Sequence, residues 1–180
     1  MRCDPRQGTL MRHCLLPIAA ATLSIAVPGA AATRDRAMPS TAEAANRALI
    51  ETAFARWAAG DGDIFDLLAD DVSWHITGRD PAIATTYRSR EALLAATSRP
   101  LRARLAGPLK PEVRRIWADG DDVLVHWDGS APMADGSTYR NTYLWIMTVQ
   151  GDRVAAVTAF LDNAAFKAAL AKPLPPRTRD

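Results

Sequence analysis

Residues 141–162, NTYLWIMTVQGDRVAAVTAFLD, constrain the fold of this chain more than any other stretch. Apolar and β-branched residues on either side of a Gly-Asp turn predict a β-hairpin. A hairpin with one solvated face would alternate apolar and polar side chains, whereas both faces of this one are largely apolar. Other parts of the structure must therefore cover both faces.

Helical patterns dominate the first half of the domain. The segment STAE is a capping box that starts a helix at Ser40, and Gly60 ends this helix. A second, short helix is predicted over 63–71. A third begins after Ser89, and Pro100 breaks or restarts it.

Strand patterns alternate with the turn signals DGDD, ADGS and GD in the second half. The predicted strands are 72–76, 112–118, 122–129, 138–150 and 153–161. A closing helix follows at 163–171. This order predicts one α+β domain over 40–172, with helices on one side of a curved antiparallel sheet, and a Pro-rich tail over 173–180.

Residues 1–32 have the order of a secretory signal peptide. A basic leader precedes an apolar run, and an A-x-A pattern ends at Ala32. The apolar run is shorter than the roughly 20 residues that span a bilayer. We therefore expect cleavage near Ala32, a linker over 33–39, and a periplasmic or secreted domain with no membrane contact. A disordered N-terminal tail is the alternative, and either Met1 or Met11 is the start.

Charge and cysteine content narrow the class of partner. The net charge of +2 comes from the leader, so residues 33–180 are formally neutral. A nucleic-acid partner would require a basic face, and none is therefore expected. Both cysteines, Cys3 and Cys14, leave with the leader, and only two histidines, His75 and His126, remain. We expect no disulfide, no thiol nucleophile and no metal site.

Three segments carry a resemblance to a known family. They are AAGDGDIFDLLADDVSWHITG, YRSREAL and NTYLWIMTVQGDRVAAVTAFLDNAAF. In this order and spacing they resemble the SnoaL-like group of the nuclear transport factor and ketosteroid isomerase superfamily, over about residues 41–170. The resemblance implies a cone-shaped, strongly curved antiparallel sheet with three N-terminal helices that enclose a pocket.

The resemblance also implies which hairpin residues face the pocket, because alternate residues of a strand share a face. In the second arm these are Ala156, Thr158, Phe160 and Asp162. The predicted ligand-binding residues are Trp74, Ile76, Tyr87, Asn141, Tyr143, Trp145, Met147, Thr158 and Phe160. The outward set, with Leu144, Ile146, Val157 and Leu161, is apolar enough to predict a homodimer.

Two of these assignments have a structural alternative. Tyr87 could reach the pocket mouth or simply pack, and Asn141 could orient a ligand or bond to backbone near the strand start. His75 is expected to face outward beside the inward Trp74 and Ile76.

Steroid isomerisation is not expected. That chemistry needs a carboxylate base, a tyrosine and a protonated aspartic acid. The resemblance places these three roles at Ile76, Ala53 and Trp145, none of which can perform them.

Asp162 is the first candidate for acid–base chemistry. A carboxylate at the rim of an apolar pocket loses hydration, which favours its protonated form and makes it a usable acid near neutral pH. SnoaL-like cyclases also place an acidic residue on a late strand. The alternative is a helix N-cap, because Asp162 directly precedes NAAFKAAL.

His126 is the second candidate, with Asp128 on the same strand face. If the pocket takes the more apolar face of Val123, Val125 and Trp127, both groups are merely solvated. Two functions thus stay open: an exported, cofactor-independent cyclase, isomerase, lyase or hydrolase, and a non-catalytic domain that binds a small apolar molecule or a second subunit.

Overall fold

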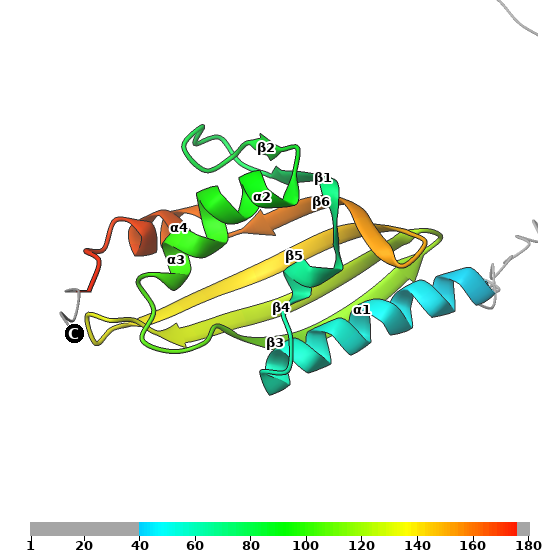
Figure 1. The fold of residues 1–180 in the computed structure, drawn as a ribbon, viewed down its shortest axis with the longest axis horizontal. Helices are drawn as coiled ribbons and strands as arrows, with labels where there is room; N and C mark the ends of the chain where they lie inside the picture. The colour runs from blue at the N-terminus through cyan, green and yellow to red at the C-terminus, as the bar shows by residue number, and fades with distance from the viewer. Residues whose placement is uncertain (1–39, 176–180) are drawn as a thin grey trace, which may run out of the picture. The chain divides into compact units, whose positions relative to one another are not determined.

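The computed structural model describes residues 40–175 (Figure 1). The predicted signal peptide, the linker and the last five residues of the predicted tail lie outside the described residues.

Helix α1 (Thr41–Ala59) begins and ends at the predicted residues. Ser40 Oγ accepts a hydrogen bond from Glu43 N at 3.0 Å, and Gly60 follows the helix with φ of 82°, a left-handed conformation that glycine adopts without strain. The helix buries Ile50, Phe54 and Trp57 against the sheet.

The predicted second helix over 63–71 is wrong in its extent. The chain makes one 3₁₀ turn, η1 (Ile64–Leu67), capped by Asp63, and strand β1 (Leu68–Ile76) begins at once. Leu68 already pairs with Val154 of the last strand, so sheet hydrogen bonds replace the helical ones that a longer helix would make.

The sheet has six strands in the order β2-β1-β6-β5-β4-β3. Besides β1, its strands are β2 (Thr86–Tyr87), β3 (Lys110–Asp119), β4 (Asp122–Pro132), β5 (Thr138–Gln150) and β6 (Arg153–Leu161). All neighbours are antiparallel except β1 and β6, which are parallel. The predicted α+β class is confirmed, as a curved, open sheet with helices over one face (Figure 1).

The helix-covered face forms the core. Val123, Val125, Trp127 and Met147 are fully buried on it. In Figure 1, α1 lies on the β3 side and the segment of α2 (Arg90–Leu93) and α3 (Arg99–Arg102) on the β1 side of this face.

A bulge in β6 reverses the predicted facing of its second half. Gln150 pairs with Arg153 and Val149 with Val154, but Thr148 pairs with Ala156. The ladder thus skips Ala155, and every later partner moves by one residue. A regular ladder would have placed Thr158 opposite Trp145, whereas Ala159 takes that position.

The prediction that Thr158 and Phe160 face the pocket is therefore wrong. Phe160 is 42% exposed, whereas Ala159 is 1% exposed. Val157 and Leu161, which were predicted to face outward, lie instead on the covered face. Leu144 and Ile146 do lie on the outer face, partly exposed.

Pro100 alters the α2–α3 segment without ending it. Residues Leu94–Ser98 form one π turn between the two short helices. Proline cannot donate the usual hydrogen bond and its ring crowds the preceding turn, which favours the wider spacing. The π turn buries Thr97 and Ser98 on the side that faces the sheet.

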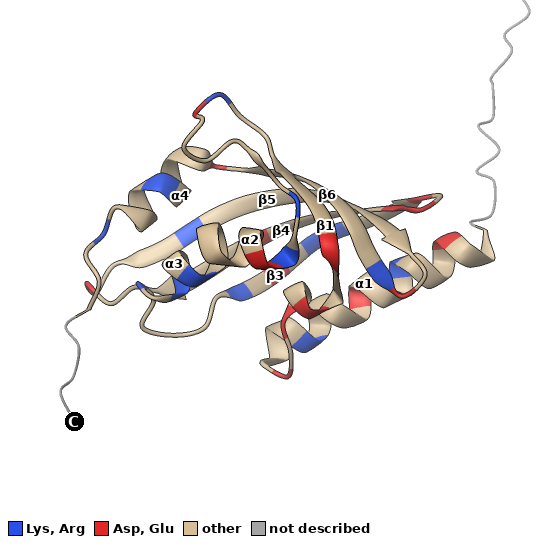
Figure 2. Cartoon of the chain, turned by 45° about the horizontal axis from the view of Figure 1, so that its top comes forward, with Lys and Arg blue, Asp and Glu red and all other residues tan. Residues whose placement is uncertain are grey.

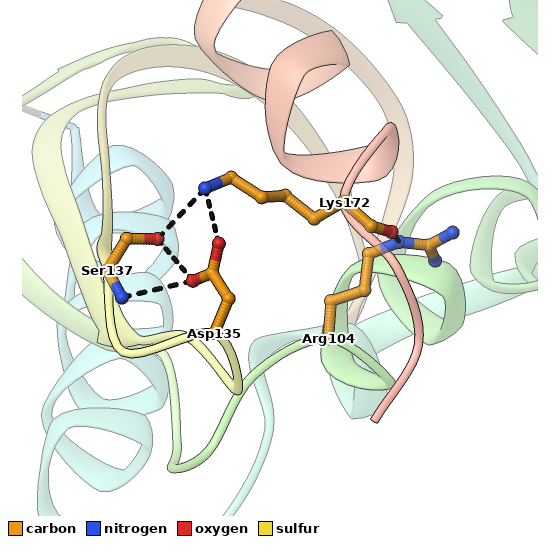
Figure 3. Close-up of polar contacts among 4 residues, drawn as sticks. All are labelled: Arg104, Asp135, Ser137 and Lys172. Atoms are coloured by element: carbon orange, nitrogen blue, oxygen red, sulfur yellow. Dashed lines mark hydrogen bonds and ion pairs between the residues drawn. The ribbon is translucent and has the colours of Figure 1, made fainter. Parts of the chain in front are cut away.

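Helix α4 (Asn163–Leu170) closes the domain, and polar contacts fix the chain after it (Figure 3). Arg104 Nε donates to the Lys172 carbonyl at 2.7 Å. Lys172 Nζ donates to Asp135 Oδ2 at 2.5 Å and to Ser137 Oγ at 3.2 Å. The hydrogen bond from Lys172 and those from Ser137 hold the pKa of Asp135 well below its ordinary value. These contacts join the residues just after α3, the β4–β5 turn and the C-terminal segment.

Candidate functional site

A pocket of about 470 Å³ lies between the sheet and the helices. This volume is in the range of sites for small organic molecules. Its walls come from α1, η1, the α2–α3 segment, residues 105–109, four strands and α4. The lining is mostly apolar and includes Ile76, Leu93, Leu101, Leu105, Leu109, Ala159, Leu161 and Phe166.

Four of the five tryptophans line this pocket, from α1 and three strands. Trp145 lies at their centre, with its ring 4.9 Å from Trp74 at 82° and 4.8 Å from Trp127 at 78°. These edge-to-face contacts hold the rings in place. Such a rigid aromatic wall suits flat, apolar molecules.

Trp127 and Tyr143 form a stacked pair in the same wall. Their ring centres are 4.0 Å apart and their planes differ by 9°. Gly129 makes room for the pair, since a Cβ there would lie 2.9 Å from Trp127 Cζ3 and 3.1 Å from Tyr143 Cε2. The indole N–H of Trp127 is buried and has no hydrogen-bond partner among residues 40–175.

A buried polar network adjoins the stacked pair. Tyr143 Oη lies 2.6 Å from Tyr139 Oη, which also accepts from Asn141 Nδ2 at 3.0 Å. All three side chains are at most 6% exposed. Burial raises the pKa of both tyrosines, so both hydroxyls are protonated at neutral pH.

Asp63 is the one carboxylate among the described lining residues, and its oxygens are engaged. Oδ1 accepts from Phe65 N at 3.1 Å, and Oδ2 pairs with Arg102, which also lines the pocket. The pair joins η1 to α3 beside the pocket. The Asp63–Arg102 ion pair therefore has a structural role in this state of the pocket.

The π turn contributes two hydroxyls to the lining. Thr97 Oγ1 donates to the Leu93 carbonyl at 2.7 Å, which commits its proton. Ser98 is 9% exposed and lines the pocket.

Asp162 acts as the N-cap of α4 and does not line the pocket. Its Oδ1 accepts from Ala165 N at 2.9 Å, and the side chain is exposed. The sequence left open whether Asp162 is a pocket acid or a helix N-cap, and in the structure it is the N-cap.

His126 lies on the outer face of the sheet, away from the pocket. Its strand directs Val123, Val125 and Trp127 into the core, so His126 and Asp128 alternate outward. Asp128 accepts from Thr142 Oγ1 at 2.6 Å and from Arg114 Nε at 2.8 Å, and these hydrogen bonds lower its pKa. The predicted His–Asp pair is thus not a pocket group.

The predicted ligand-binding residues divide into three sets. Trp74, Ile76, Tyr143 and Trp145 line the pocket. Met147, Asn141 and Tyr87 do not, because the first two are buried in the core and Tyr87 packs at its edge on β2. Thr158 and Phe160 lie on the outer face. His75 is exposed and bonds to Thr86.

The pocket residues that come from the helices are not among those predicted from the sequence. Trp57 belongs to the apolar stripe of α1, so a pattern existed that could have indicated it. Asp63, Ser98 and Arg102 had no local signal, because their position depends on how η1 and the π turn pack over the sheet.

Neither a metal cluster nor a membrane span is found in the described part of the chain. Residues 40–175 contain no group of three His, Cys, Asp or Glu side chains that could hold a metal ion. None of the described helices is long and apolar enough to cross a bilayer. Lys and Arg lie interspersed with Asp and Glu over the domain, so its described surface mixes both signs (Figure 2).

Solved structures share this fold. Bal32a, from a soil-derived mobile gene cassette, is 19% identical with a TM-score of 0.57 and covers 72% of this chain and 98% of its own. A Jannaschia protein described as a SnoaL-like polyketide cyclase is 18% identical with a TM-score of 0.57, covering 74% and 96%.

A third structure, from Catenulispora acidiphila, has a ketosteroid isomerase-like fold and was solved in complex with trimethylamine. It is 17% identical with a TM-score of 0.50, covering 69% of this chain and 93% of its own. At these identities the likeness concerns the fold. No curated protein matches the sequence.

The curved sheet with its helix-covered pocket has the fold of nuclear transport factor-like and ketosteroid isomerase-like proteins. The SnoaL-like domain family matches residues 50–157, and the chain belongs to this family.

Proposed function

We propose that this chain is a small-molecule-binding protein whose pocket takes an uncharged, largely apolar molecule that contains rings. The observation that carries this proposal is the lining, in which four tryptophans and a set of aliphatic side chains surround about 470 Å³. Apolar burial supplies the affinity, and the rigid aromatic wall selects flat ligands. The relative described as a polyketide cyclase supports ligands of this class.

Binding is favoured over acid–base catalysis because of where the titratable groups lie. Asp162 caps α4 and His126 lies on the outer face, so neither predicted acid or base reaches the pocket. Asp63 is engaged by η1 and Arg102. A general base needs a free lone pair within reach of the ligand.

The test is a titration with N-phenyl-1-naphthylamine, a neutral fluorescent probe. We expect saturable binding with a blue-shifted emission. Ala159→Leu should weaken binding, because Ala159 lines the pocket, whereas Thr158→Leu, one residue along on the outer face, should not. Equal binding by both variants, with unchanged melting temperatures, would overturn the proposal.

Cofactor-independent catalysis is the second candidate, and Asp63 is the observation in its favour. A ligand that displaced Arg102 would free this carboxylate beside the pocket. The assay is exchange of the α-protons of 2-tetralone in D₂O, followed by NMR. Catalysis predicts exchange above the buffer rate that Asp63→Asn abolishes, and a rate equal to buffer rejects it for this substrate.

Export and dimerisation are further proposals. We propose that residues 1–32 direct export and are removed near Ala32, which mass spectrometry of secreted protein would test. We also propose a homodimer through the outer face, where Leu144 lies opposite the exposed Phe160. A second copy of the same apolar face would cover both. Light scattering should give twice the monomer mass.

A further inference from the structure

The polar network beside the pocket has a fixed orientation. Asp162 N donates to Asn141 Oδ1 at 2.9 Å, so the Asn141 amide nitrogen must lie on the other side. That nitrogen donates to the Asp162 carbonyl at 3.0 Å and to Tyr139 Oη at 3.0 Å. Both amide hydrogens are therefore used, and one of them is directed at Tyr139.

The network contains one more donor than it can satisfy. Tyr139 and Tyr143 each carry a hydroxyl proton, but a single proton lies between oxygens that are 2.6 Å apart. Among residues 40–175, neither hydroxyl has any other acceptor. A buried donor without an acceptor is unfavourable, so the remaining proton needs a partner from outside the network.

The positions of the two rings favour assigning the surplus proton to Tyr143. Tyr139 is 3% exposed and does not line the pocket, so its proton has only Tyr143 Oη to reach. Tyr143 does line the pocket. In the resulting chain, Asn141 donates to Tyr139 and Tyr139 donates to Tyr143, and each bond polarises the next and strengthens Tyr143 as a donor.

A second unused donor lies in the same wall. Trp127, whose ring stacks on Tyr143, also lines the pocket, and its buried N–H has no partner among the described residues. An anionic ligand is disfavoured, because Arg102, the one described cation of the lining, already pairs with Asp63. The lining thus favours a neutral acceptor over an anionic one.

We propose that the pocket recognises a ring-containing molecule through a carbonyl oxygen, which accepts a hydrogen bond from the Tyr143 hydroxyl. Tyr139 and Asn141 are positioning residues, which orient that hydroxyl without touching the ligand. This inference rests on the proposed function and adds the chemical group that determines specificity.

The test compares two probes of nearly equal shape, 2-acetylnaphthalene and 2-isopropylnaphthalene, each displacing N-phenyl-1-naphthylamine. The wild-type protein should prefer the ketone by roughly tenfold, the value of one net hydrogen bond of this kind. Tyr143→Phe should remove this preference without weakening hydrocarbon binding. Tyr139→Phe should reduce it partly, and Tyr87→Phe, outside the lining, should leave it unchanged.

The outcomes separate the two proposals. If neither naphthalene binds, the proposed function fails. If both bind equally to the wild-type protein, the pocket stands and the carbonyl inference fails. Should Tyr143→Phe not fold, the infrared band of a ¹³C-labelled ketone decides, because a hydrogen-bonded carbonyl absorbs at lower frequency than the same ketone in hexane. An unshifted band overturns the inference.

Discussion

Asn141→Leu should destabilise the domain strongly, although the residue touches no ligand. The substitution keeps the side-chain size but removes three hydrogen bonds, one from Asp162 N, one to the Asp162 carbonyl and one to Tyr139 Oη. Each contributes about 0.5–1.5 kcal/mol net, so the free energy of unfolding should fall by about 2–4 kcal/mol. Asn141 is 6% exposed, so water cannot easily replace these partners.

Urea unfolding, followed by tryptophan fluorescence and far-ultraviolet circular dichroism, measures this loss. With a slope of about 2 kcal/mol per molar urea, the midpoint should fall by about 1–2 M. Arg140→Leu, the neighbouring exposed residue on the other strand face, is the matched control and should stay within about 0.5 kcal/mol of the wild type. A loss below about 1 kcal/mol for Asn141→Leu would refute the role given to the network.

Three further predictions concern other parts of the domain. Asp162→Ala should cost about 1 kcal/mol of stability by removing the α4 cap, whereas Asp162→Asn should retain both stability and probe binding; a loss of binding in the Asn variant would restore a ligand role. Because Lys172 and Ser137 hold the pKa of Asp135 below its ordinary value of 3.8, this contact contributes its full stability above that pH and loses it progressively as the pH falls from there through the lowered pKa of the folded state. The stability difference between wild type and Lys172→Met should therefore be smaller at pH 2 than at pH 7, and an equal difference at the two pH values would contradict the assignment. Phe160→Arg should halve the mass seen by light scattering while leaving the melting temperature of the monomer nearly unchanged, and an unaltered mass would place any dimer contact elsewhere.

Local signals in the sequence were sufficient to predict the bounds of helices and hairpins, because a few neighbouring residues decide these. Ser40 and Gly60 bound α1, and the hairpin of β5 and β6 has the predicted limits. Caps and turns depend on hydrogen bonds and backbone angles within four residues, and for that reason they can be read without the rest of the chain. The family resemblance then gave the fold and the presence of a pocket.

The same local signals could not give the content of the pocket. One skipped residue, Ala155, exchanged the inward and outward sets of β6, and no motif in RVAAVTAFL marks it. Strand facing has a period of two, so a single bulge reverses every later assignment. Thr158 and Phe160 were misplaced for this reason alone.

By itself, then, the sequence determined the element types, their order and the apolar character of the enclosed space. The tertiary structure decided which residues meet there, from Ser98 on the π turn to the surplus hydroxyl proton of Tyr143. The physical reason is that a site depends on the register between strands and on the angle at which helices cross them. Both are set by packing and hydrogen bonds between residues far apart in the chain, which no local pattern records.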